Sequence, residues 1–341
     1  MIRLIKLGMW IIVLWFLVSW ALYHHRLNPI DEDSAKKIPV TIESGASVRS
    51  IGTLLEEKEV IRSGSAFTKY VSKHDLDTSL RAGTFVLSPS QSVEDIAQLL
   101  SAGQTDEDKI TIPEGFTVSQ IDALLAERGF GEAGDLIHCA FTCDFSSFSF
   151  LPKQNASSEK SGFGSKLEGY LFPDTYFVSR SDYVPKFFLE RMLGTYRTNV
   201  VNGLSKDLTS SNRTLAEITI MASLIEEETR MDDERPVVSG ILWKRFDAKT
   251  GLGVDATIRY LHQNQSDPLT ASDLDADSPY NTRKYRGLPP GPIANAGLKS
   301  FKAALHPETS EYWYYLHDAS GQIHYAVTND EHNENKATYL R

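Results

Sequence analysis

Hydrophobic and polar positions follow one pattern three times in the first third of the chain. Each copy begins with two apolar residues separated by one other residue, which is the spacing of side chains on one face of a β-strand. A short turn follows. A serine or threonine suited to cap a helix comes next, then an apolar V-x-x-I-x-x-L-L stripe at helical spacing. The copies are VTIESGASVRSIGTLL from Val40, FVLSPSQSVEDIAQLL from Phe85 and ITIPEGFTVSQIDALL from Ile110, with the expected caps at Ser47, Ser92 and Thr117. Because the copies are 45 and then 25 residues apart, they predict a compact α+β module over residues 39 to about 130 rather than a solenoid.

A second pattern is the uncharged run from Leu7 to Tyr23. At about 1.5 Å per residue it would measure about 25 Å, the short end of the range for a transmembrane helix. Two basic residues precede the run, and one follows it after two histidines. This charge pattern favours a cytoplasmic N-terminus and residues 27–341 outside. We therefore expect a retained membrane anchor, and the alternative is a cleaved signal peptide.

Residues 131–341 do not repeat this strand–helix pattern. Residues 131–165 mix aromatic residues with Ser, Gly and Lys, which predicts a linker or excursion. Residues 166–341 contain a long helical region and a late hairpin in which YWYYL and QIHYAV flank the turn HDASG. The expected fold class is thus α+β: a transmembrane anchor over residues 1–26, the strand–helix module over 27–130, the linker, and a mixed α+β domain over 166–341.

Composition and charge mainly exclude functions. The net charge is −10, with 41 % hydrophobic and 23 % charged residues, and no cluster of Lys and Arg stands out, so nucleic acid is not an expected partner. Cys139 and Cys143 are the only cysteines. They could pair in an oxidising compartment or stay unpaired, and they are too few for a zinc site. The motifs of zinc peptidases, α/β-hydrolases and nucleotide-binding proteins are missing, and we expect neither metal nor cofactor.

Candidate chemistry lies in the stretch ASLIEEETR, residues 222–230. A capping box predicts that its helix begins at Thr214. We assign each residue an angle around the helix axis, at 100° per residue with Ile225 as zero. Glu227 then lies at about +200°, away from the apolar residues, and Glu228 at about −60°, among them. Burial would raise the pKa of Glu228, as a general acid requires. The alternative is that the helix frays by residue 228 and Glu228 reaches solvent.

Four stretches of the chain resemble the endolytic murein transglycosylases of the MltG (YceG-like) family, in the family's order. They are LEGYLFPDTY (167–176), ASLIEEET (222–229), SPYNTRKYRGLPPGPIANAG (278–297) and TNDEHN (328–333). The resemblance implies an enzyme anchored in the bacterial inner membrane, with a LysM-like subdomain before the catalytic domain. It further implies internal cleavage of peptidoglycan glycan strands between N-acetylmuramic acid and N-acetylglucosamine, with a 1,6-anhydro ring on the product. Penicillin-binding proteins in the same membrane are the implied protein partners.

The resemblance also implies site residues. Glu228 matches the family's catalytic acid, the residue that the helical positions place among apolar ones. Asp255 and Thr257 flank Ala256, where the family usually has proline. The residues expected to bind or enclose the sugar are Tyr280, Asn281 and Thr282, which match a motif of goose-type lysozyme folds, and Pro289 and Pro290 in a loop expected to wall the cleft. The alternative for that loop is a purely structural turn.

Several alternatives stay open at this point. A hydrolytic muramidase on the same fold would use water in place of the sugar hydroxyl, and a non-catalytic peptidoglycan-binding scaffold would need no acid at all. Glu168 is a candidate second acid, although a buried aromatic turn is the favoured interpretation of its surroundings. His332 and Asn333 either border the cleft or cap the last helix, and the cap is favoured.

Overall fold

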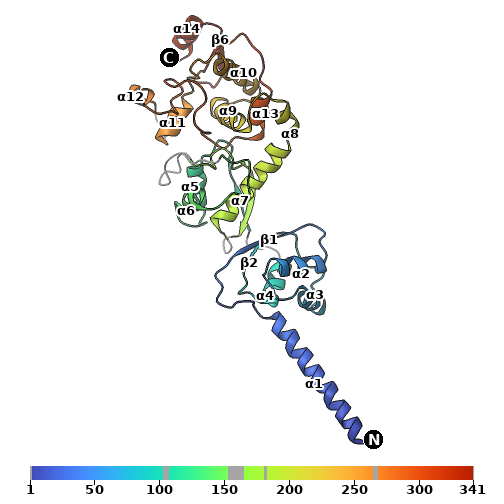
Figure 1. Cartoon of the computed structure of the whole chain (residues 1–341). Coiled ribbons are helices and arrows are strands. Elements are labelled where there is room, and N and C mark those ends of the chain that lie inside the picture. Colours follow the sequence, from blue (N-terminus) through green and yellow to red (C-terminus); the bar gives the residue numbers. More distant parts are fainter. Residues whose placement is uncertain (1, 103–106, 153–164, 180–182, 264–267, 341) are drawn as a thin grey trace. The chain divides into compact units, whose positions relative to one another are not determined.

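A computed structural model of the chain describes all residues except 1, 103–106, 153–164, 180–182, 264–267 and 341 (Figure 1). The side chains of residues 2–13 and 107 also lie outside this description. The chain forms two compact units, Met1–Asp108 with Val178–Asp182 and Lys109–Phe177 with Tyr183–Arg341. The third copy of the strand–helix pattern, which starts at Ile110, therefore belongs to the second unit.

The first unit contains the first two copies of the pattern, and both form as predicted. Its elements are α1 (Ile2–Leu27), β1 (Ile38–Ile42), α2 (Val48–Glu57), α3 (Gly64–Lys73), β2 (Gly83–Leu87) and α4 (Val93–Ala102). β1 pairs antiparallel with β2, with Val40 opposite Phe85. The Ser47 hydroxyl accepts a hydrogen bond from the N–H of Ser50 at the start of α2. The Ser92 hydroxyl accepts one from the N–H of Asp95 (3.1 Å) at the start of α4.

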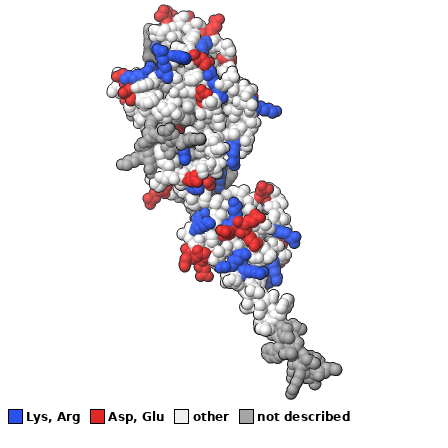
Figure 2. All heavy atoms as spheres, in the orientation of Figure 1, with Lys and Arg blue, Asp and Glu red and all other residues white. Residues whose placement is uncertain are grey.

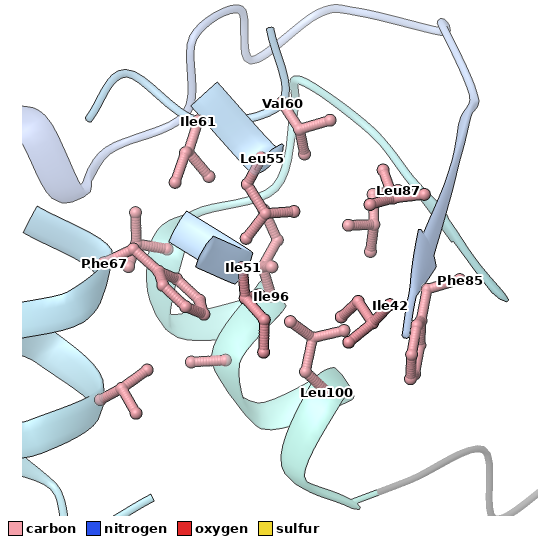
Figure 3. Close-up of a cluster of buried hydrophobic side chains, with 14 of the residues drawn as sticks. Ile42, Ile51, Leu55, Val60, Ile61, Phe67, Phe85, Leu87, Ile96 and Leu100 are labelled. Atoms are coloured by element: carbon pink, nitrogen blue, oxygen red, sulfur yellow. The ribbon is translucent and has the colours of Figure 1, made fainter. Parts of the chain in front are cut away.

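The apolar stripes of the first unit meet in one core. Figure 3 shows side chains from the two strands and from α2, α3 and α4 pointing toward one another. The fully or nearly fully buried members include Val40, Leu55, Phe67, Phe85, Leu87, Ile96 and Leu100. Burial of one such side chain stabilises the fold by about 1.5–3 kcal/mol, so the two copies of the pattern contribute to the stability of this unit together with Phe67 and its neighbours in α3.

The prediction that Leu7–Tyr23 crosses a membrane is wrong. Among the residues that the structure describes, no helix is long and apolar enough to span a bilayer. The side chains of α1 are described only from Leu14 onward. The last turn of α1 is polar, with His24, His25 and Arg26.

The second unit is mostly helical. Its elements are β3 (Glu107–Thr111, which begins in the first unit), α5 (Val118–Glu127), α6 (Asp135–Thr142), β4 (Thr175–Ser179), α7 (Pro185–Tyr196), a π-helix (Arg197–Asn202), α8 (Ser205–Ser210), α9 (Leu215–Glu228), α10 (Glu234–Asp247), α11 (Ala256–His262), α12 (Ala271–Leu274), α13 (Leu298–Leu305), β5 (Tyr314–His317), β6 (Ile323–Ala326) and α14 (Asn329–Tyr339). β3 pairs with β4. β5 and β6 form the predicted antiparallel hairpin. The predicted caps at Thr117 and Thr214 are present, and both form capping boxes.

Within residues 131–165, the stretch expected to be a linker, the chain forms α6, and Cys139 and Cys143 make a disulfide at its end. Residues 153–164 of the same stretch lie outside the described residues. The disulfide decides between the two states of the cysteines that the sequence left open.

The helix α9 lies at the centre of the second unit and packs against α10, α11 and α13 (Figure 1). Its buried residues include Met221, Ala222, Leu224 and Ile225, but also the polar Thr219 and Ser223. A helix buried on nearly all sides belongs to the middle of a core. Because its last turn emerges from that core, α9 carries the three glutamates to the edge of the packed interior.

The molecular surface carries charges of both signs. On the face that Figure 2 shows, acidic and basic side chains are interspersed over each unit. This distribution agrees with the ordinary charged content of the chain and its moderate negative net charge. A mixed surface of this kind favours solubility.

The backbone of Gly169, in the stretch LEGYLFPDTY, lies close to the ring of Pro292. Its φ is +82°, and an added Cβ would overlap the Pro292 ring. We expect Gly169→Ala to lower the free energy of unfolding by about 3 kcal/mol, through backbone strain and steric overlap together. Gly194→Ala is the matched control, since Gly194 lies in α7 with no atom within 4 Å of its added Cβ. Gly194→Ala should leave the free energy of unfolding unchanged or raise it by up to about 1 kcal/mol. Urea unfolding measures both variants.

Candidate active site

The three consecutive glutamates at the end of α9 have three different surroundings. The side chain of Glu226 is only 7 % exposed, forms an ion pair with Arg235 (Nη2 to Oε1, 3.3 Å) and accepts a hydrogen bond from the N–H of Gly297 (2.9 Å). Glu227 is exposed, as its helical position predicted. Glu228 is the last residue of the helix and lies partly buried in the wall of a cavity. Burial also raises the pKa of the Glu227 carboxyl group, to about 7, but of the three glutamates Glu228 is the one that lines the cavity.

The cavity beside Glu228 has a volume of about 540 Å³. Its walls come from the end of α10, the loop before α11, the strand β5 and the helix α14. A cavity of this size lies within the range of sites that hold small ligands or a few sugar units. Most of its lining side chains are polar or charged, which suits a hydroxyl-rich ligand.

Two hydrogen-bond donors hold the Glu228 carboxyl group. The Tyr315 hydroxyl donates to Oε2 (2.8 Å), and the backbone N–H of Ala256 donates from the start of α11. Burial raises the pKa of Glu228 above its usual range, and the charge of Asp255 adds to this effect. The two donors and His317 oppose the rise because they favour the ionised form. Glu228 is thus a fixed carboxyl group with a raised pKa.

Asp255 and Thr257 are two of the expected site residues. Asp255 faces the cavity of Glu228, whereas Thr257 does not. Asp255 lines the cavity and forms an ion pair with Arg283 (Nε to Oδ1, 2.6 Å). Thr257 is fully buried, and its hydroxyl donates to the carbonyl oxygen of Val254 (2.7 Å). The structure therefore brings Asp255 to the same cavity as Glu228 and uses Thr257 to shape the turn before α11.

Tyr280, Asn281 and Thr282 are buried and interact with other parts of the protein. Tyr280 packs against Tyr260, with ring centroids 5.4 Å apart. The Asn281 amide nitrogen donates to the carbonyl oxygens of Leu274 (3.0 Å) and Ala276 (2.9 Å). The Thr282 hydroxyl accepts from the N–H of Val254 (2.9 Å). None of the three lines the cavity of Glu228. The bonds of Asn281 hold the end of α12 and the residues after it, and the bond of Thr282 holds Val254, the residue before Asp255.

The loop with the two prolines presents them differently. Pro289 is buried and Pro290 is exposed. Neither contributes to the cavity of Glu228. The neighbouring Gly291 lies close to the hydroxyl of Tyr280, which is 3.0 Å from the position of an added Cβ. The loop thus packs against the segment that contains Tyr280.

Sequence patterns indicated no functional role for two of the cavity residues, Tyr315 and Arg245. Tyr315 lies 87 positions from Glu228 along the chain, in a hairpin that the pattern predicted without a functional role. Arg245 lines the cavity from α10. His332 also lines it, so the prediction that His332 caps the last helix is wrong: the cap of α14 is Thr328, in a capping box with Glu331. The T-x-x-E pattern at Thr328 was the signal that could have separated the two roles.

Glu168 is a second buried acid, away from this cavity. Its oxygens accept hydrogen bonds from the N–H of Val118 (3.1 Å), the amide of Asn295 (3.1 Å) and the hydroxyl of Tyr260 (3.2 Å). Burial raises the pKa of Glu168 to about 8, although these donors work against the rise. Glu168 borders a separate cavity of about 90 Å³ beside α5 and α11. Its contacts join three segments of the second unit, as the favoured interpretation of a buried turn implies.

The geometry defines a class of site. Among the described residues, no group of three or more His, Cys, Asp or Glu side chains is placed to hold a metal ion. What the cavity offers is a carboxyl group with a raised pKa, fixed by two donors, at the edge of a polar space. These are the requirements for general acid–base catalysis on an extended polar ligand.

The chain belongs to the YceG-like family, whose model matches residues 40–338. It is 32 % identical over 320 residues to an endolytic murein transglycosylase from Bacillus subtilis strain 168, covering 92 % of this chain and 88 % of the relative. It is 30 % identical to a protein of the same name from Streptococcus pneumoniae strain D39, of which it spans 60 % of the length. A crystal structure of a YceG-like protein from Listeria monocytogenes has 30 % identity and a TM-score of 0.61, covering 88 % of this chain and 99 % of that one.

Proposed function

We propose that this chain is a peptidoglycan lytic transglycosylase that cleaves glycan strands internally, with Glu228 as its acid–base. The observation that carries the proposal is the fixed Glu228 carboxyl group at the wall of the cavity. The names of the curated relatives support the same reaction and the same substrate class. Because murein lies outside the cytoplasmic membrane, the enzyme acts outside the cytoplasm.

A single carboxyl group is sufficient for this reaction. Glu228 donates its proton to the oxygen between N-acetylmuramic acid and N-acetylglucosamine, and the bond from that oxygen to the anomeric carbon breaks. The acetamido oxygen of the same muramic acid relieves the positive charge at this carbon. Glu228, now ionised, takes the proton of the 6-hydroxyl, whose oxygen bonds to the anomeric carbon and closes the 1,6-anhydro ring. Glu228 returns to its protonated form, and no water is consumed.

A hydrolytic muramidase is the second candidate function, and the position of Asp255 is the observation that favours it. Asp255 lines the same cavity as Glu228. Inverting glycosidases use a second carboxylate to activate water. The ion pair with Arg283 (2.6 Å) holds the Asp255 carboxyl group at the wall of this cavity. In that reaction water replaces the 6-hydroxyl, and the product gains one water molecule.

Products distinguish the two candidates. We would incubate the full chain with purified glycan strands and weigh the released fragments by mass spectrometry. Internal fragments with anhydro ends are the expected result. Fragments heavier by one water would instead assign a muramidase, and Asp255→Asn should then abolish their release. If the wild-type chain releases no fragments at all, the chain is not an autonomous glycan-cleaving enzyme.

The Tyr315 hydroxyl should tune the pH range of the reaction. Tyr315→Phe removes a donor that favours the ionised form of Glu228, so the pKa of Glu228 rises further. Because the first step needs protonated Glu228, the fall of the rate at alkaline pH should move to higher pH. The maximal rate should drop up to about tenfold, as expected when one orienting hydrogen bond is lost.

Initial cleavage rates between about pH 5 and pH 9 measure this shift. Tyr325→Phe is the matched control: Tyr325 pairs with Tyr315 across the hairpin, but its ring stacks on Tyr312 (4.9 Å). The control should keep the wild-type pH profile. An unchanged profile in Tyr315→Phe would mean that its hydroxyl does not act on the acid during the reaction.

A further inference from the structure

The cavity of Glu228 is lined by three permanently cationic side chains, Arg245, Arg283 and Lys336. Arg283 is neutralised by its ion pair with Asp255. For Arg245 and Lys336, no carboxylate lies within ion-pair distance among the described residues. Part of the cavity therefore carries positive charge that the protein itself does not balance.

Arg245 is held rigidly in this wall. Its Nη1 donates to the carbonyl oxygen of Leu252 (2.6 Å), and its guanidinium carbon lies 5.0 Å from the ring centroid of Tyr314. These contacts fix the guanidinium group and leave donors that the Leu252 carbonyl does not use. An unpaired, partly buried cation costs free energy, which a bound anion would offset.

His332 completes the same region. Its ring stacks on Tyr314 with centroids 5.1 Å apart, so Arg245 and His332 both contact Tyr314. The Nδ1 atom of His332 is buried and has no hydrogen-bond partner among the described residues. Burial lowers the pKa of His332, and the charges of Lys336 and Arg245 lower it further, which places these cations close to the ring.

We propose that Arg245, Lys336 and His332 form an anion-binding subsite that holds a carboxylate of the glycan strand beside Glu228. This inference rests on the proposed function, because it names which substrates the same cavity selects. Two carboxylates of peptidoglycan fit the chemistry: those of the peptides attached to the muramic acid, and the lactyl carboxylate that is free where a peptide has been removed. Neutral polymers of N-acetylglucosamine offer no such group, so the subsite would discriminate against them.

Binding, measured apart from cleavage, tests the subsite. The full chain with Glu228→Gln keeps the cavity and leaves the ligand intact, so calorimetry gives a Kd. Three ligands would be compared: peptide-bearing strands, peptide-free strands with lactyl carboxylates, and peptide-free strands whose carboxyl groups have been reduced to alcohols. Lys336→Gln is added to this background, with Lys302→Gln as the matched control, since Lys302 is an exposed lysine of α13 outside the cavity.

We expect Lys336→Gln to weaken binding of a carboxylate-bearing strand about fivefold and to leave the reduced strand unaffected. Loss confined to peptide-bearing strands assigns a peptide carboxylate, and loss confined to peptide-free strands assigns the lactyl group. The pKa of His332, followed by NMR, should rise when the carboxylate-bearing ligand binds, because an anion offsets the neighbouring cations.

Other outcomes separate this inference from the proposed function. Equal weakening for carboxylate-bearing and reduced strands, or no weakening for any strand, would overturn the subsite even if the wild-type chain cleaves glycan. An effect of Lys302→Gln equal to that of Lys336→Gln would overturn it as well, because long-range charge would then explain both. Carboxylate-dependent binding by a chain whose wild type cleaves nothing would support the subsite and reject the enzyme.

Discussion

Replacing Glu228 with glutamine is expected to slow glycan cleavage by about a thousandfold, which is within the usual contribution of general acid–base catalysis. Glutamine has nearly the same shape and can still accept hydrogen bonds from the Tyr315 hydroxyl and the Ala256 N–H. The cavity should therefore stay intact. What the variant lacks is a proton to give to the glycosidic oxygen and a base to receive one from the 6-hydroxyl.

Glu227→Gln is the matched control for this loss. It makes the same chemical change one position earlier, on an exposed side chain, and should keep activity within about twofold. Time courses of fragment release by mass spectrometry measure both variants. If Glu228→Gln kept more than a tenth of the wild-type rate, Glu228 would not be the acid. An equal loss in Glu227→Gln would point to helix damage rather than to chemistry.

Glu168 should give the second unit an unusual dependence of stability on pH. Its pKa is about 8 in the folded chain against an ordinary value of 4.5. Between these values the folded state holds a proton that the unfolded state has lost. The free energy of unfolding therefore falls as the pH rises, by about 1.4 kcal/mol per pH unit for one proton. Between pH 5 and pH 8 the loss from Glu168 amounts to about 3–4 kcal/mol.

The variant Glu168→Gln separates this effect from other titrating groups. Glutamine is neutral at every pH and keeps acceptor and donor atoms near Val118, Asn295 and Tyr260. The free energy of unfolding of Glu168→Gln, measured in urea, should equal that of the wild type near pH 5 and exceed it near pH 8. Parallel stability curves for the two proteins would show that Glu168 is ionised in the folded chain. Glu168→Ala should be less stable at both values, by about 2–4 kcal/mol, because three buried donors lose their acceptor.

Local patterns predicted the helices and strands well where the physics is local. The turn residues and apolar stripes gave α2, α4 and α5 together with their caps, because capping and helical spacing involve residues only three or four apart. The helical wheel also separated Glu227 from Glu228. The same helical positions underestimated the burial of α9. Thr219 and Ser223 are buried as well, but because they are polar, the hydrophobic pattern did not mark them as core residues.

Features that depend on distant residues could not be read from the sequence. The bond from Tyr315 to Glu228 and the shared stacking of Arg245 and His332 on Tyr314 join segments far apart in the chain. The resemblance directed attention to Asn281 as a sugar ligand, but its amide lies inside and bonds to backbone carbonyls. The apolar run near the N-terminus was misjudged, because composition alone does not establish a spanning helix.

The order of synthesis has a consequence for when the site exists. Glu228 leaves the ribosome 87 residues before Tyr315, and the cavity walls formed by β5 and α14 come later than the acid as well. A nascent chain that has reached residue 312 holds the glutamate without its hydroxyl partner or its cavity. Under the proposed function, catalytic capacity therefore appears only after β5 and α14 have been made and have folded, so a translation product interrupted before them would lack a complete site.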